Sequence, residues 1–157
     1  VSGLCEAKFD FLTVQGDPQV IRAAVKGRGN YGMKILAVTF LTSLDRDDLD
    51  QNMIKPGTIE DLAVIRAEKA ILAGADGVIS SPKELTLLRK NHHCTKKLIV
   101  TPGIRPTKFA TNDQKRVATP HEALKNGASY LVIGRPIYQA KDPLAAYKEI
   151  KTEISQA

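Results

Sequence analysis

The chain of 157 residues is 43% hydrophobic and 25% charged, which is typical of a globular protein with a buried core. No apolar run approaches the ~20 residues of a membrane span, so we expect no membrane insertion. The net charge of +6 comes from lysines that are mixed with acidic residues, and aromatic residues make up only 5%, so we do not expect nucleic-acid binding. Two cysteines, Cys5 and Cys94, favour a reducing, cytoplasmic compartment over a disulfide scaffold.

Short apolar runs alternate along the chain with segments of helical periodicity. The runs are FLTV (11–14), KILAVTF (34–40), GVIS (77–80), KLIVT (97–101) and YLVIG (130–134). Continuous β-branched runs are typical of strands buried on both faces of a parallel sheet. We therefore predict the α/β class, with parallel βα units. Because no Pro- or Ser-rich linker divides the chain, we expect residues 1–157 to form a single domain.

Capping signals mark two of the helices. Thr58 precedes the segment IEDLAVIRAEKAIL, and Thr119 precedes PHEALK with Glu122 at the third helical position. Gly74 and Gly127 stand where these two helices should end. Repeated βα units build either an open sheet or a closed barrel. A full (β/α)₈ TIM barrel needs ~250 residues, so this chain of about five strands is expected to form a partial one.

Ligands of parallel α/β proteins bind at the carboxyl ends of the strands. The last two predicted strands deliver TPGIR (101–105) and GRP (134–136) to that edge. Glycine lets the backbone approach an anion, and arginine donates two parallel hydrogen bonds to it. Arg135 is thus a candidate phosphate ligand, although an ordinary surface arginine paired with a helix acid remains the alternative.

Four motifs, in order, resemble orotidine 5′-monophosphate decarboxylase of the bacterial short form. They are AVTFLTSLD (37–45), VTPGIRP (100–106), DQKRVATPHEAL (113–124) and YLVIGRPI (130–137). FLTVQGDPQVIRAAV (11–25) fits the fourth strand and helix of that family, so the chain should match the C-terminal part of its TIM barrel. The family converts orotidine monophosphate (OMP) to UMP and CO₂ in pyrimidine biosynthesis, with no metal and no cofactor.

The resemblance implies roles for seven residues. The expected phosphate ligands are Arg105, Gln114, Gly134 and Arg135. The expected contacts to the base are Thr42, Ser43 and Pro102. The implied partner is an OMP- or UMP-like nucleotide, bound through its phosphate.

The family's catalytic residues have no match here. They form a Lys-Asp-Lys array on a DxKxxD strand, which does not occur in these 157 residues. Lys8 and Asp10 are poor substitutes, and Gln15 stands where the family usually has histidine. We therefore name no catalytic residue and expect this chain to be inactive alone.

Several alternatives stay open from the sequence. The chain could be one half of a split enzyme, or a non-catalytic half-barrel that keeps a phosphate site. A third alternative is another phosphate-binding barrel enzyme, such as a sugar-phosphate epimerase. An incomplete sheet would leave a strand edge and residues such as Leu12 and Val14 in water, so we expect a homo-oligomer or a complementary fragment. NHHC (91–94) lacks further ligands at zinc spacing and is expected to be a polar loop, not a metal site.

Overall fold

The computed structural model describes residues 1–52, 54–106 and 115–155. In these ranges one parallel sheet holds five strands in chain order, namely β1 (Phe11–Gln15), β2 (Lys34–Val38), β3 (Gly77–Ile79), β4 (Leu98–Thr101) and β5 (Tyr130–Leu131). The helices are α1 (Ser2–Glu6), α2 (Pro18–Arg28), α3 (Arg46–Gln51), α4 (Ile59–Leu72), the 3₁₀ turn η1 (Pro82–Glu84), α5 (Leu85–Lys90), α6 (Pro120–Lys125), α7 (Arg135–Tyr138) and α8 (Pro143–Ser155). The predicted class and the parallel βα units are confirmed.

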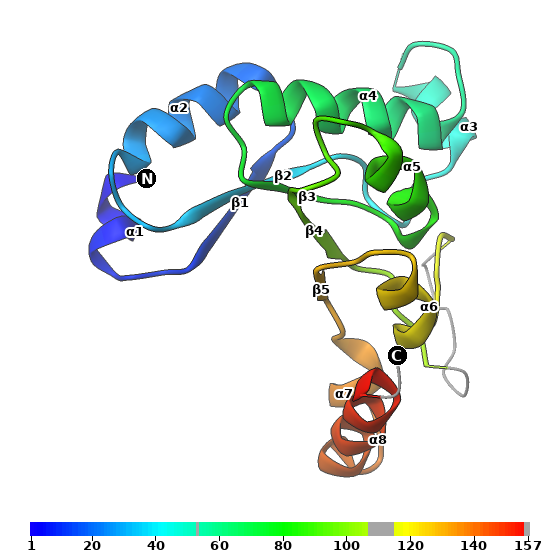
Figure 1. Cartoon of the computed structure of the whole chain (residues 1–157). Coiled ribbons are helices and arrows are strands. Elements are labelled where there is room, and N and C mark those ends of the chain that lie inside the picture. Colours follow the sequence, from blue (N-terminus) through cyan, green and yellow to red (C-terminus); the bar gives the residue numbers. More distant parts are fainter. Residues whose placement is uncertain (53, 107–114, 156–157) are drawn as a thin grey trace.

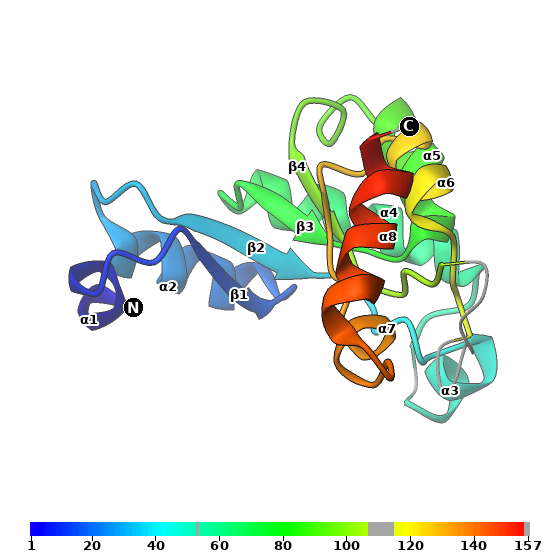
Figure 2. The ribbon, with the colours of Figure 1, turned by 90° about the horizontal axis from the view of Figure 1, so that it is seen from below.

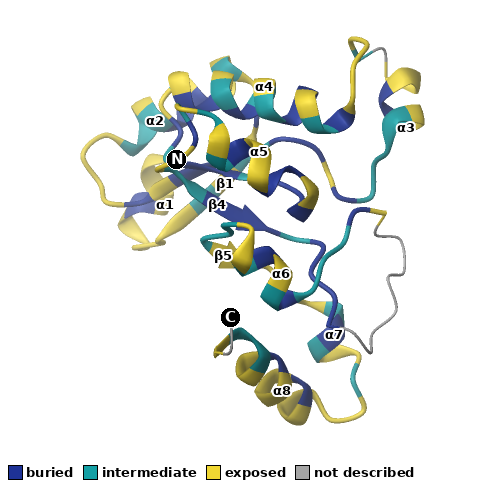
Figure 3. Ribbon diagram, turned by 45° about the vertical axis from the view of Figure 1, so that its right-hand side comes forward, coloured by how far each residue is buried: buried dark blue, intermediate teal, exposed yellow. Residues whose placement is uncertain are grey.

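The helices pack on one face of the sheet (Figure 1). Helices α2 and α4 lie against β1, β2 and β3, α6 lies beside β5, and α8 packs on α6 and α7. Between them lies the main core, whose fully buried members include Ile21, Ala37, Ala67, Val78, Leu85, Leu88 and Ile99. Burial is concentrated where the sheet meets α4 and α5, while most of α8 is exposed (Figure 3).

The predicted helix starts are found in the structure, whereas the C-caps of α4 and α6 are Ala73 and Asn126, each one residue before the predicted glycine. The Thr119 hydroxyl accepts a hydrogen bond from the Glu122 N–H, and the Glu122 carboxylate accepts one from the Thr119 N–H, which completes a capping box. Thr58 accepts from the N–H of Asp61 at the start of α4. These bonds satisfy N–H groups that would otherwise lack partners at the helix starts.

The last strand is shorter than the sequence predicts. We expected a strand over 130–134, but the ladder between β4 and β5 ends at Leu131. The Val132 N–H still donates to the Thr101 carbonyl oxygen over 2.9 Å. Beyond this point β4 continues as Pro102 and Gly103, whose φ of +77° is not that of a strand, and the chain turns at the carboxyl edge.

The sheet is curved but not closed, as expected of a partial barrel. β1 and β5 are its two edges, and the first βα unit projects from the rest of the molecule (Figure 2). Our expectation about Leu12 and Val14 is wrong, because both pack against the helix-side core. Since side chains alternate along a strand, Phe11 points to the opposite face, where its ring meets that of Tyr130 edge to face at 5.6 Å. These two aromatic rings, 41% and 50% exposed, mark the face on which no helix of the described residues packs.

Candidate functional site

A cavity of about 210 Å³ lies at the carboxyl ends of β2, β4 and β5. We call it the rim cavity, and its lining residues are Thr42, Pro102, Gly103, Arg105, Val132, Gly134, Arg135 and Tyr138. Three loops that are far apart in the sequence thus meet at one place. This is the edge at which parallel α/β proteins bind their ligands.

Five of the seven residues expected to contact a nucleotide line this cavity. They are Thr42, Pro102, Arg105, Gly134 and Arg135. Ser43 follows Thr42 in the same loop, is half-buried, and is not among the lining residues. Gln114 lies outside the described residues. Sequence reasoning did not single out Val132 and Tyr138, which the turn after β5 brings to the cavity.

The turn that carries Arg105 is anchored on both sides. The Arg105 N–H donates to the Ala118 carbonyl over 2.9 Å, and the Ala118 N–H donates to the Gly103 carbonyl over 3.3 Å. The Arg105 guanidinium donates to the Ile104 carbonyl over 2.8 Å, and the residue is only 7% exposed. A buried guanidinium held by its own backbone has little rotational freedom left to lose on binding an anion.

Gly103 is required at this turn for two reasons. Its φ of +77° is a conformation that other residues rarely adopt. A Cβ atom there would also lie 2.7 Å from the Arg116 carbonyl oxygen and 3.3 Å from Cγ2 of Thr42. The absent side chain therefore lets the β4 turn, the β2 loop and Arg116 pack together.

The β2 loop (39–45) is held by the segment that follows residue 114. The Thr42 carbonyl accepts from the N–H groups of Lys115 and Arg116 over 3.2 and 3.3 Å. The Lys115 ammonium also contacts Asp45 at 2.6 Å and Asp48 at 3.0 Å. Its hydrogen bond to Asp45, helped by the Asp48 N–H, lowers the pKa of the Asp45 carboxyl from 3.8 to about 2. The same contacts raise the pKa of Lys115.

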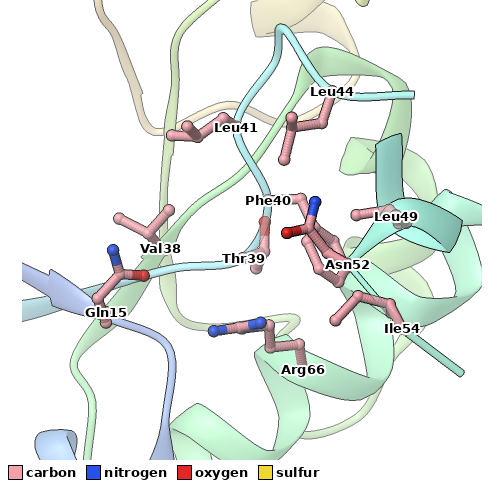
Figure 4. A pocket seen from close by; sticks show the side chains of 10 residues that line it. All are labelled: Gln15, Val38, Thr39, Phe40, Leu41, Leu44, Leu49, Asn52, Ile54 and Arg66. Carbon is pink, nitrogen blue, oxygen red and sulfur yellow. The ribbon is translucent and has the colours of Figure 1, made fainter. Parts of the chain in front are cut away.

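A second cavity of about 250 Å³ lies between the β2 loop, α3 and α4 (Figure 4). Arg66 extends across it from α4, with its guanidinium 5.3 Å from the centre of the Phe40 ring and 3.3 Å from Asp17. Gln15, which stands at the position of the family's histidine, lines this cavity and not the rim cavity. The other walls are mainly apolar, and none of the expected phosphate or base ligands that the structure describes lines it.

The sequence motif NHHC forms a polar turn between α5 and β4. The His92 and His93 rings lie 3.7 Å apart, His93 approaches Glu68 at 3.6 Å, and Asn91 donates to Glu68 over 3.1 Å. In residues 1–52, 54–106 and 115–155, no three His, Cys, Asp or Glu side chains are arranged to hold a metal ion. No helix within the same ranges is long and apolar enough to cross a membrane.

The fold and the position of the cavity place the chain in the class of α/β proteins that are built on part of a (β/α) barrel. The family model for "Orotidine 5'-phosphate decarboxylase / HUMPS family" matches residues 2–150. The chain therefore belongs to this family, and the epimerase reading is set aside.

Relatives of known name agree with this assignment. The chain is 53% identical over 154 residues to orotidine 5′-phosphate decarboxylase of Cereibacter sphaeroides, covering 98% of this chain and 66% of that protein. It is 52% identical to the same enzyme of Ruegeria pomeroyi, covering 99% of this chain and 65% of the relative. The crystal structure of the Lactobacillus acidophilus enzyme superposes with a TM-score of 0.78 at 37% identity, over 98% of this chain and 66% of that one. The chain thus spans about two thirds of the length of these relatives.

The Asp45–Lys115 contact predicts a measurable pH dependence. Because the pKa of Asp45 is lowered, the contact is fully present above pH 3.8 and is lost as the pH falls through about 2. A pH titration followed by carboxyl-carbon NMR should give a midpoint of about 2 for Asp45. Lys115→Met should raise it toward the ordinary range, although the Asp48 N–H still lowers it, and Lys148→Met on exposed α8 should leave it unchanged. A wild-type midpoint near 3.8 would show that the Lys115 ammonium does not contact the Asp45 carboxylate.

Proposed function

We propose that this chain carries the phosphate-binding portion of an orotidine 5′-phosphate decarboxylase and binds an OMP- or UMP-like nucleotide at the rim cavity. The observation that carries the proposal is the convergence of Thr42, Pro102, Arg105, Gly134 and Arg135 on one cavity. The family assignment supplies the substrate class, since the named relatives are orotidine 5′-phosphate decarboxylases.

The chemistry of the cavity fits a phosphorylated ligand. Arg105 and Arg135 would each donate charge-assisted hydrogen bonds to phosphate oxygens. Because Gly134 has no side chain, the phosphate could also approach the backbone there closely. The Thr42 hydroxyl would bond a polar edge of the base, while Pro102 would offer an apolar surface to the ring. Gln114 is retained as a fourth phosphate ligand in this proposal.

We infer that residues 1–157 by themselves bind the nucleotide without decarboxylating it. Loss of CO₂ leaves an electron pair on C6, which a proton donor must quench, and the family uses a lysine set between aspartates. No DxKxxD motif occurs in the sequence. Lys8 and Asp10 precede β1, at the amino end of the sheet, whereas the rim cavity lies at the carboxyl ends.

The turnover of OMP by this chain should accordingly stay at the uncatalysed background. The reaction is followed by the absorbance of the pyrimidine ring. The unaltered chain is compared with Arg135→Ala, which lacks a proposed phosphate ligand. Turnover that is well above background and is abolished by Arg135→Ala would contradict the proposal. Turnover that appears only when a second chain carrying a Lys-Asp-Lys strand is added would support the split-enzyme form of it.

The central test is the binding of UMP, with uridine as control. We expect UMP to shift the amide NMR signals of the turns after β4 and β5, and uridine to shift them far less. Arg135→Ala should cost about 1.5–3 kcal/mol of UMP binding, roughly ten- to a hundred-fold in Kd. Arg22→Ala, an exposed arginine on α2, should change nothing. Equal shifts with UMP and uridine, or no effect of Arg135→Ala, would refute a phosphate site.

We also propose that a second copy of this chain covers the face marked by Phe11 and Tyr130. Exposed aromatic rings beside an unpaired strand edge favour association. In sedimentation velocity we expect a dimer or higher oligomer that Phe11→Glu shifts toward monomer. Tyr31→Glu changes a similarly exposed ring in the loop between α2 and β2, and it should not shift the oligomer toward monomer. A monomer at every concentration would exclude this proposal.

A further inference from the structure

A buried ion pair involves Arg116, whose backbone contacts Thr42 and Gly103 in the wall of the rim cavity. Arg116 is 6% exposed and Glu84 is fully buried, and the Arg116 guanidinium contacts the Glu84 carboxylate. The second carboxylate oxygen of Glu84 accepts from the Ser80 hydroxyl and the Ser81 N–H, each over 2.7 Å. Burial raises the pKa of Glu84, and the Arg116 charge and these hydrogen bonds oppose that rise. None of these four residues lines the rim cavity.

The same guanidinium also holds the β2 loop. Arg116 donates to the Leu41 carbonyl over 2.9 Å and to the Phe40 carbonyl over 3.4 Å. Through Glu84 these bonds connect the end of β2 to the end of β3. The planar fork of arginine can serve several acceptors at once, which a lysine ammonium on its flexible stem does less well.

The backbone of Arg116 lies between the two halves of the proposed nucleotide site. Its N–H donates to the Thr42 carbonyl, on the side expected to contact the base. Its carbonyl oxygen lies against Gly103, in the turn that carries Arg105 on the phosphate side. The position of Arg116 therefore sets how far Thr42 stands from Arg105.

We propose that Arg116, held by Glu84, is a positioning residue that fixes the base side of the rim cavity relative to its phosphate side. This rests on the proposed function. A nucleotide must reach both sides at once, whereas inorganic phosphate needs only the phosphate side. Loss of the Arg116–Glu84 contact should therefore weaken UMP binding more than phosphate binding. A general loss of stability would weaken both equally.

Arg89 provides a matched control for this distinction. Its guanidinium, like that of Arg116, bonds several backbone carbonyls, namely those of Gly127, Thr95 and Lys97. These lie just before β4 and β5, at the opposite end of the strands from the rim cavity. Arg89→Met removes a comparable set of bonds without touching the β2 loop.

The experiment measures Kd for UMP and for inorganic phosphate in the wild type, Arg116→Met, Arg116→Lys, Glu84→Gln and Arg89→Met. We expect Arg116→Met to weaken UMP binding by about ten-fold or more, with phosphate binding within about three-fold. Arg116→Lys should recover part of the loss in UMP binding. Glu84→Gln keeps the size and shape of the side chain but removes its charge, and it should reproduce the loss. It therefore replaces Arg116→Met if that variant does not fold. Arg89→Met should keep the wild-type ratio of the two affinities. Equal weakening of both ligands, or the same change of ratio in Arg89→Met, overturns the proposal.

Amide hydrogen exchange tests the positioning without any ligand. The N–H groups of Lys115, Arg116 and Ala118 should exchange faster in the Arg116→Met or Glu84→Gln variant, while those of the β3–β4 ladder keep their protection. Unchanged exchange at all three amides overturns the proposal. If the wild type binds neither UMP nor phosphate, the proposed function fails and exchange alone decides whether Arg116 holds the two loops together.

Discussion

The contact between Glu84 and Arg116 is the constraint on which the carboxyl edge of the sheet depends. Two charges removed from water are costly unless each finds partners, and removal of one member of such a pair typically costs about 3–5 kcal/mol. Here Ser80, Ser81 and the Leu41 carbonyl supply further hydrogen bonds. The pair thus joins the ends of β2 and β3 to the segment after β4. Thr42 and Gly103, which contact the backbone of Arg116, line the rim cavity.

Much of the fold follows from local sequence signals. Thr58 and Thr119 begin their helices as the capping pattern predicts, and the five apolar runs become five parallel strands. Parallel strands bring their carboxyl ends to one edge, so the meeting of Arg105 with Arg135 could be anticipated once the strands were assigned. The resemblance in four motifs then supplied the expectation that Thr42 and Pro102 join them.

The errors arise where tertiary contacts decide. The apolar character of Leu12 and Val14 does not say which face of the sheet they occupy, and both lie half-buried against the helices where exposure was expected. The role of Arg116 was also missed, because its partner Glu84 is 32 residues away and reads in the sequence as an ordinary capping glutamate after Ser81. The Ser-x-x-Glu spacing was visible. The burial of that carboxylate, which makes an arginine partner necessary, was not.

We predict that the rim cavity exists before a ligand arrives, because the contacts that shape it are internal to the protein. A crystal structure of this chain with UMP tests that claim most directly. We predict the phosphate within hydrogen-bonding distance of Arg105 and Arg135, the base toward Thr42 and Pro102, and the Glu84–Arg116 contact unchanged. A nucleotide bound in the cavity beside Arg66, or one bound at the rim only after Arg116 has left Glu84, would contradict it.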